Sequence, residues 1–116
     1  IQLNHAQPHP RNYGTFPRVL GLYVRKLNVI SLVEAIRRMT SLPASILGLS
    51  NRGKIKKGFW ADLVIFDQSK IIDNATWKSP HQYPSGISWV LVNGKIAINN
   101  GKYTDSLPGK FLKHSL

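Results

Sequence analysis

Apolar residues recur at three- and four-residue spacing through the first half of the chain. From Thr15 to about Asn28, the spacing predicts one amphipathic helix, whose apolar stripe is Phe16, Val19, Leu20, Tyr23, Val24 and Leu27. A second helix is predicted over residues 31–42, where Ser31 and Glu34 have the spacing of a capping box. A third, short helix follows, with Pro43 in its first turn and Gly48 at its end.

After Gly48 the period shortens to that of β-strands. An apolar run bounded by aspartates occupies residues 61–67 and predicts a buried strand. Two β-branched runs, 87–92 and 95–98, flank Asn93-Gly94, the pair that best suits a two-residue type I′ hairpin turn. Asn100-Gly101 predicts a second turn. Between the strands, residues 68–86 contain Pro80, Pro84 and Gly86, and we expect a loop that crosses the surface.

Helices therefore precede strands, an order typical of an α+β chain or of parts of two domains. Three or four short strands cannot cover both faces of a strand such as 63–66, and a lone hairpin is marginal in water. We expect the missing cover to come from another segment of a longer chain or from a partner chain. The chain begins with Ile1 rather than Met, and we interpret it as cut from something longer.

Composition favours a globular protein, because 42% of the 116 residues are hydrophobic and 18% are charged. No apolar run approaches the ~20 residues of a membrane span, and the first ten residues have neither the apolar nor the basic region of a signal peptide. We therefore expect no membrane partner and a cytoplasmic location. The absence of cysteine excludes disulfides and thiolate metal sites within these residues.

The charge is strongly positive, with 16 Lys and Arg against 5 Asp and Glu, a net charge of +11. Nucleic-acid-binding proteins have such a balance. The basic residues are nevertheless spread along the chain, with no block of five or six and no RNP, zinc-finger or Gly-rich RNA motif. We favour a solvated basic face with no nucleic-acid partner, and a small basic nucleic-acid-binding module stays as an alternative.

The carboxylates do not form an obvious acid–base pair. Asp62 and Asp67 bracket the predicted strand and point to opposite faces, because side chains alternate along a strand. We assign them turn and strand-end roles. Asp73 and Asp105 lie in loop-like stretches without a motif, and Glu34 already has a capping role. No Gly-x-Ser-x-Gly, Gly-x-Gly-x-x-Gly or P-loop motif is present.

The histidines are equally weak candidates. His5 and His9 have the spacing of two metal ligands on one helical face, but Pro8 and Pro10 disfavour a helix there. His81 and His114 stand alone in the sequence, and we expect both to be solvated.

One stretch, residues 8–21 (PHPRNYGTFPRVLG), holds an arginine in an unusual setting. Arg11 lies between His9-Pro10 and Asn12-Tyr13-Gly14. Two prolines stiffen the approach to it, because each fixes its own φ and biases the preceding residue to extended geometry. We expect Gly14 to let the backbone turn. Arg11 is therefore held as if to meet a partner.

Taken as a whole, from about His9 to about Lys110, the chain resembles the C-terminal end of the D-aminoacylase (N-acyl-D-amino-acid deacylase) family of the amidohydrolase superfamily. The resemblance is carried by HPRNYGTFPR at 9–18, SLVEAIRRMTSLPASILGL at 31–49, NRGKIKKGFWADLVIFD at 51–67, DNATWKSPHQYPSGISWVLVNG at 73–94 and GKYTDSLPGK at 101–110. The ADLVIFD piece is common across amidohydrolases, whereas HPRNYGTFPR narrows the resemblance to D-aminoacylases.

The family implies a (β/α)₈ metal-dependent hydrolase barrel with a zinc site and a small β-sandwich built from both ends of the polypeptide. By this resemblance, residues 1–50 are the end of the barrel, with a substrate loop at 1–14 and closing helices at 15–28 and 31–42. Residues 51–116 are then the C-terminal part of the sandwich, mainly 53–103. The resemblance also implies that the remainder of the parent chain is a partner of this fragment and covers its strands. Without that cover, we expect the fragment to self-associate.

The resemblance also implies a function. In this family the arginine of the His-Pro-Arg motif, here Arg11, binds the carboxylate of the N-acyl-D-amino acid; the alternative is that Arg11 only ties down its loop by bonding backbone carbonyls. The zinc ligands and the catalytic aspartate match no residue here, so we expect a zinc-dependent parent enzyme and an inactive, zinc-free fragment with no catalytic residue. Another amidohydrolase, dihydroorotase- or hydantoinase-like, is the alternative within the superfamily.

Overall fold

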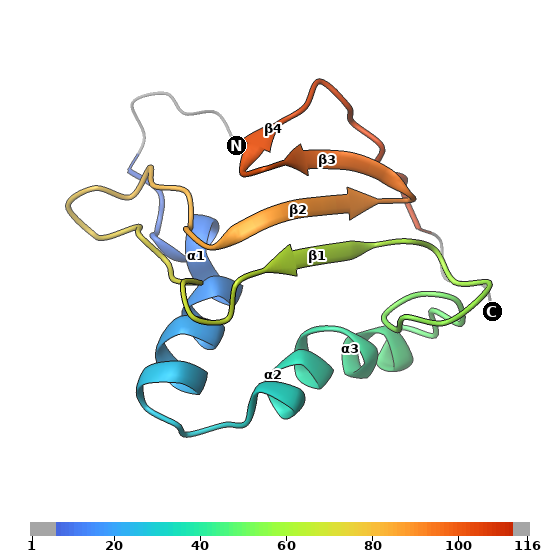
Figure 1. The fold of residues 1–116 in the computed structure, drawn as a ribbon, viewed down its shortest axis with the longest axis horizontal. Helices are drawn as coiled ribbons and strands as arrows, with labels where there is room; N and C mark the ends of the chain where they lie inside the picture. The colour runs from blue at the N-terminus through green and yellow to red at the C-terminus, as the bar shows by residue number, and fades with distance from the viewer. Residues whose placement is uncertain (1–6, 113–116) are drawn as a thin grey trace. The chain divides into compact units, whose positions relative to one another are not determined.

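The computed structural model describes residues 7–112, which fall into two compact units. The first unit comprises residues 1–31, of which 7–31 are described, and residues 67–86. The second comprises residues 32–66 and 87–116, described as far as 112. Helices lie in both units, and all four strands lie in the second (Figure 1). These units do not follow the division at residues 50 and 51 that the resemblance implies, and the assignment of segments to barrel and sandwich stays a prediction.

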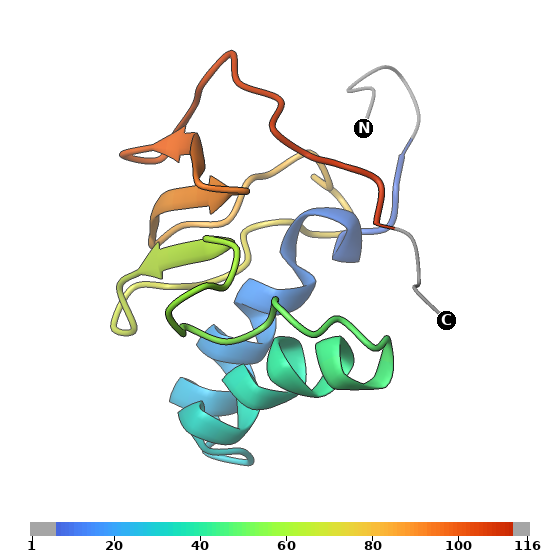
Figure 2. The ribbon, with the colours of Figure 1, turned by 90° about the vertical axis from the view of Figure 1, so that its right-hand side faces the viewer.

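The first unit begins with α1 (Arg11–Arg18), which continues into the π-helix η1 (Val19–Lys26). The two segments form one continuous helix (Figure 2). The helix starts four residues before the predicted Thr15, so the expectation of a loop is wrong over residues 11–14. The reason is Pro10 at the N-cap, whose φ of −52° and ψ of −28° already match the first helical turn.

The core of the first unit joins the helix to the segment 67–86. Leu20 and Val24 of η1 are buried, as are Ile71 and Ala75. At Gly21 an added Cβ would meet the backbone oxygen of Ile71 at 2.5 Å, so only glycine permits this close approach. The prediction that 68–86 crosses the surface as a loop is therefore wrong for its first part, which provides the most buried large side chain, Ile71 at 2% exposure.

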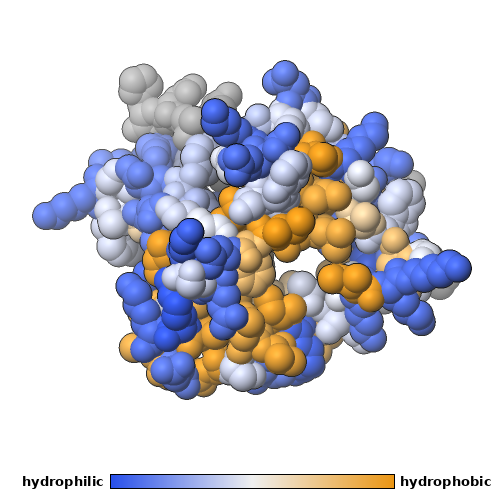
Figure 3. All heavy atoms as spheres, in the orientation of Figure 1, coloured by the Kyte–Doolittle hydropathy of each residue, from blue (hydrophilic) through white to orange (hydrophobic). Residues whose placement is uncertain are grey.

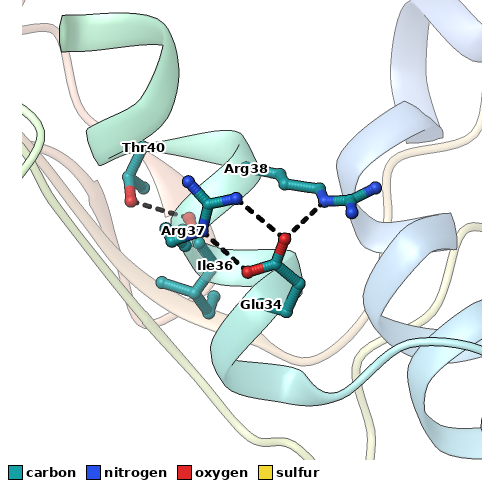
Figure 4. Close-up of polar contacts among 5 residues, drawn as sticks. All are labelled: Glu34, Ile36, Arg37, Arg38 and Thr40. Atoms are coloured by element: carbon teal, nitrogen blue, oxygen red, sulfur yellow. Dashed lines mark hydrogen bonds and ion pairs between the residues drawn. The ribbon is translucent and has the colours of Figure 1, made fainter.

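The second unit begins with α2 (Leu32–Met39) and α3 (Ser41–Ile46), and both predicted helices are confirmed. Ala35 and Ala44 are buried. Glu34 lies between two arginines of its own helix (Figure 4): its carboxylate accepts from Arg37 at 2.7 and 2.9 Å and from Arg38 at 2.7 Å. The hydrogen bonds from Arg37 and then Arg38 lower the pKa of Glu34 to about 2. A capping role for Glu34 beside this pairing stays a prediction.

Four antiparallel strands form one sheet whose spatial order follows the chain: β1 (Leu63–Phe66), β2 (Ile87–Val92), β3 (Lys95–Asn99) and β4 (Lys102–Tyr103). The two predicted turns are confirmed. Asn93 and Gly94 have φ of 50° and 78°, and Asn100 and Gly101 have φ of 47° and 77°, the left-handed pairs that two-residue hairpins require.

No strand residue in the described part of the sheet is fully buried. In β1, Val64 and Ile65 are 54% and 53% exposed, so the prediction of a buried strand is wrong for this chain, although the strand itself is confirmed. The position of β1 explains this: it is an edge of the sheet, paired with β2 alone. Apolar side chains accordingly reach the surface among polar ones (Figure 3). Within residues 7–112, no helix has the length and apolar content that crossing a membrane requires.

Candidate functional site

Arg11 is the first residue of α1, and its backbone is held on both sides. Its N–H donates to Nδ1 of His9 at 3.1 Å, and its carbonyl accepts from the Thr15 hydroxyl at 2.7 Å. Its guanidinium is exposed and also touches His9, with Nε 3.2 Å from Nδ1 and Nη2 3.2 Å from Nε2. Among residues 7–112, no carboxylate pairs with Arg11, and no backbone carbonyl accepts from its guanidinium.

Arg11 lines a concave pocket of about 580 Å³ in the first unit. The rest of the lining comes from the start of the helix and from the segment after Ile71: His9, Pro10, Gly14, Thr15, Arg18, Val19, Tyr23, Asp73, Ala75, Thr76 and Trp77. The pocket thus combines two guanidinium groups with aromatic and hydroxyl side chains. Such a mixture suits a small organic anion that carries an apolar portion.

The second cation of the pocket, Arg18, is already neutralised. Its Nη1 lies 2.9 Å from Oδ2 of Asp73, whose side chain is only 10% exposed. The hydrogen bond and the charge of Asp73 raise the pKa of Arg18. Gly14 packs against Asp73: a Cβ added at Gly14 would stand 2.5 Å from the Asp73 Cβ. The predicted role of Gly14 as a turn is wrong: it is a buried helical residue that lets Asp73 approach.

Arg25, in the same unit, has a structural role. Its Nη1 donates to the backbone carbonyls of Gln68 at 2.9 Å and Ile71 at 2.6 Å, and so ties the segment after β1 to the helix. Arg11 makes no such bonds among the described residues. Of these three arginines, two are used internally and Arg11 is available to a ligand.

The histidines and carboxylates mostly have structural partners. His81 is not simply solvated as predicted, since its Nδ1 lies 2.8 Å from the Tyr13 hydroxyl and its ring meets the Tyr13 ring edge-on. Asp67 accepts from the backbone and hydroxyl of Ser69 and so closes a turn, which confirms its strand-end role. His5 and His114 lie outside the described residues.

Asp62, the other strand-end carboxylate, belongs to a polar cluster in the second unit. It pairs with Arg52 and accepts from the N–H of Asn93 at 2.8 Å. The side chain of Asn93 accepts from Arg52 at 2.6 Å and donates to the carbonyl of Pro108 at 2.7 Å. The cluster holds four chain segments together and leaves no free charge on Asp62. Sequence reasoning assigned Asn93 to the turn alone, because its links to Arg52 and Pro108 have no local signature.

Residues 7–112 contain no group of three or more His, Cys, Asp or Glu side chains that could hold a metal ion. These residues therefore do not fit a metal centre by themselves. What the described site can do is bind an anion, through the guanidinium of Arg11 at the pocket, which has no carboxylate partner among residues 7–112.

Several known proteins with similar sequences and structures are D-aminoacylases or deacylases of N-acyl-D-amino acids. The chain is 50% identical over 91 residues to the N-acyl-D-glutamate deacylase of Alcaligenes xylosoxydans xylosoxydans, covering 78% of this chain and 19% of that protein. Among solved structures, a D-aminoacylase described as having a binuclear metal centre is 43% identical, with a TM-score of 0.84, and the match covers 86% of this chain and 21% of that one. The N-acyl-D-glutamate deacylase of Bordetella bronchiseptica, solved with zinc and a phosphonate mimic of the tetrahedral intermediate, is 48% identical with a TM-score of 0.78, covering 79% and 19%.

The chain therefore spans about a fifth of the length of these relatives. The resemblance to D-aminoacylases inferred from the sequence motifs is confirmed by these matches. A family model described as "Amidohydrolase family" matches residues 2–98, which is most of the chain. The chain belongs to the amidohydrolase family.

Proposed function

We propose that these residues are one part of a longer metal-dependent amidohydrolase, here called the complete protein, which hydrolyses the amide of N-acyl-D-amino acids. The products are a carboxylate and a free D-amino acid. The proposal is supported by the similarity to deacylases of this substrate class, at 43–50% identity over 78–86% of the chain. Family membership makes a stand-alone nucleic-acid-binding module the less supported alternative.

Within this function we assign Arg11 to the carboxylate of the substrate. The observation that carries the assignment is the contrast among the three arginines: Arg18 is paired with Asp73 and Arg25 with backbone carbonyls, whereas the Arg11 cation has neither kind of partner among residues 7–112. A guanidinium at a pocket meets a carboxylate with two parallel hydrogen bonds. The alternative role, tying down its own loop through carbonyls, has no such bond to support it among residues 7–112.

The remaining machinery of the complete protein belongs to segments beyond the described residues. We place α1, η1 and α2 at the close of a (β/α)₈ barrel and the four strands in the C-terminal share of a sandwich, as the resemblance implies. The metal would then be held by ligands contributed by other segments, since residues 7–112 do not form such a site. A cytoplasmic location stays a prediction from the sequence.

The test replaces Arg11 by lysine in the complete protein and compares N-acetyl-D-amino acids with the corresponding amides. An ammonium keeps the charge but cannot reproduce the two-pronged geometry. Charge-assisted hydrogen bonds are worth ~1.5–3 kcal/mol each, so kcat/KM for the acid should fall by roughly ten- to a hundredfold. The amide substrate has no carboxylate to accept two hydrogen bonds from the guanidinium, so its turnover should change little.

Arg18→Lys is the matched control, because Arg18 lines the same pocket but is engaged by Asp73. We expect it to affect acid and amide substrates equally. An equal loss on both substrates for Arg11→Lys, or a fall in thermal stability that accounts for the lost rate, contradicts the assignment of Arg11. Absence of any amide hydrolysis by the metal-loaded complete protein contradicts the proposed function itself.

A further inference from the structure

The guanidinium of Arg11 is held on one edge only. Both contacts to His9 use the Nε–Nη2 side, with Nε 3.2 Å from Nδ1 and Nη2 3.2 Å from Nε2. Nη1 has no partner among residues 7–112. A guanidinium can grip a carboxylate side-on, through Nε and Nη2, or end-on, through Nη1 and Nη2. With the side edge against His9, the end that remains open is the Nη1–Nη2 end.

His9 must be uncharged to hold Arg11 in this way. Its Nδ1 accepts from the Arg11 backbone N–H and from Nε–H when the ring proton sits on Nε2. In that tautomer Nε2 is a donor, so Nη2 lies beside it without a hydrogen bond, and the hydrogen bond from Nε alone fixes the guanidinium. An imidazolium would have no acceptor and would repel the guanidinium. The main chain of His9 is itself restricted, because Pro8 precedes it and Pro10 follows it.

The ring of His9 is in turn supported from the segment 67–86. Trp77 meets it edge-on, with ring centroids 4.4 Å apart and planes at 67°. Trp77 is carried by a tight turn closed at both ends, since the Thr76 N–H donates to the Ser79 carbonyl at 3.0 Å and the Ser79 N–H donates to the Thr76 hydroxyl at 3.0 Å. Trp77 is 72% exposed, so it gains little from burial at this place. We therefore interpret its contact with His9 as one that holds the imidazole ring in place.

Resting on the function proposed above, we propose that His9 and Trp77 are positioning residues that hold the Nε–Nη2 edge of Arg11, so that the substrate carboxylate binds end-on at Nη1 and Nη2. An exposed arginine has many rotamers, and ordering it in advance removes an entropic cost that substrate binding would otherwise carry. The pair thus sets the affinity for acidic substrates and touches no reacting atom.

The test measures KM and kcat of the metal-loaded complete protein for an N-acetyl-D-amino acid and its amide. Ordering one rotamer-rich side chain corresponds to about a three- to tenfold change, so His9→Ala should raise KM for the acid by that factor and leave kcat and metal content within about twofold. His9→Asn places an acceptor near the position of Nδ1 and should recover most of the loss. Trp77→Ala should raise KM for the acid about two- to threefold, and Trp77→Phe, which keeps an aromatic edge, should not.

A double substitution separates this proposal from the role of Arg11. If His9 acts through Arg11, His9→Ala should have no further effect on the acid when Arg11 is already alanine. An acid-specific loss in Arg11→Ala, together with equal acid and amide losses in His9→Ala, overturns the positioning role and leaves the proposed function standing. No acid-specific loss in Arg11→Ala overturns both the positioning role and the assignment of Arg11 to the substrate carboxylate. Additive losses in the double variant also overturn the positioning role, because they would mean that His9 acts on the substrate by itself.

Discussion

Replacing Gly21 by alanine should have two opposite effects on the free energy of unfolding. Alanine is favoured over glycine in a helix by about 1 kcal/mol, so propensity alone predicts stabilisation. The structure predicts the reverse, because the new Cβ would lie 2.5 Å from the Ile71 oxygen and 2.6 Å from Cδ1 of Ile72. The first distance is about 0.9 Å shorter than the 3.4 Å at which ordinary contact begins, and the atom concerned is backbone.

The magnitude follows from what must move. Overpacking of this kind costs about 1–3 kcal/mol. The displaced carbonyl is also the acceptor of the 2.6 Å bond from Arg25, and hydrogen bonds to charged groups are worth about 1.5–3 kcal/mol. Part of that bond survives a shift of the carbonyl, so after subtraction of the helix preference we expect a net loss of about 2 kcal/mol.

Urea unfolding followed by circular dichroism measures this loss. With a slope of about 2 kcal/mol per M, the midpoint of Gly21→Ala should fall by about 1 M. Gly109→Ala is the matched control, since nothing lies within 4 Å of its added Cβ and its φ is not positive, and its midpoint should move by less than about 0.3 M. Equal midpoints for the two variants, or a higher one for Gly21→Ala, would refute the close packing of helix and segment.

Three further predictions concern the second unit. The carboxyl of Glu34 should titrate in NMR near pH 2, so the stability due to its pairing is complete above the ordinary value of 4.5 and is lost as the pH falls towards 2; a midpoint near 4.5 contradicts the pairing. Asn93→Gly keeps the left-handed turn but removes two side-chain hydrogen bonds and should cost about 1–3 kcal/mol in denaturant unfolding. Asn100→Gly, in the equivalent turn without such bonds among residues 7–112, should change stability by less than about 0.5 kcal/mol, and equal costs would refute the role of Asn93. The isolated 116-residue chain should self-associate in light scattering, because Val64 and Ile65 expose more than half of their surface on an edge strand, and a monomer with dispersed amide resonances at high concentration contradicts this.

Local signals predicted the elements that local physics determines. The Asn-Gly pairs specify left-handed turns, and both turns occur at the predicted residues. The S-x-x-E spacing and the apolar residues at three- and four-residue spacing predicted a helix over 31–42, and α2 begins one residue later than predicted and ends three residues earlier. What failed depends on residues far apart in the sequence: Ile71 looked like part of a surface loop because its partner, Gly21, lies fifty positions earlier.

The candidate site divides in the same way. Arg11 stood out from the sequence because the two prolines that precede it are visible there, and its role came from the family motif. The contacts that make it distinctive did not, since Arg18 pairs with an aspartate 55 residues away and Trp77 reaches His9 from the segment after β1. Gly14 illustrates the limit: glycine signals either a turn or a close approach, and only the position of Asp73 decides between them.

The chain passes from one compact unit to the other three times, after residues 31, 66 and 86. Neither unit is consequently a continuous stretch of sequence, and no single cut of the gene separates one from the other. A truncation anywhere between β1 and β2 removes material from both units. Among residues 7–112, β1 has no strand to pair with until the ribosome has added the twenty residues of 67–86 and then β2. A deletion that removes the whole sheet, from β1 to β4, therefore also removes the segment 67–86, and with it Trp77 from beside His9.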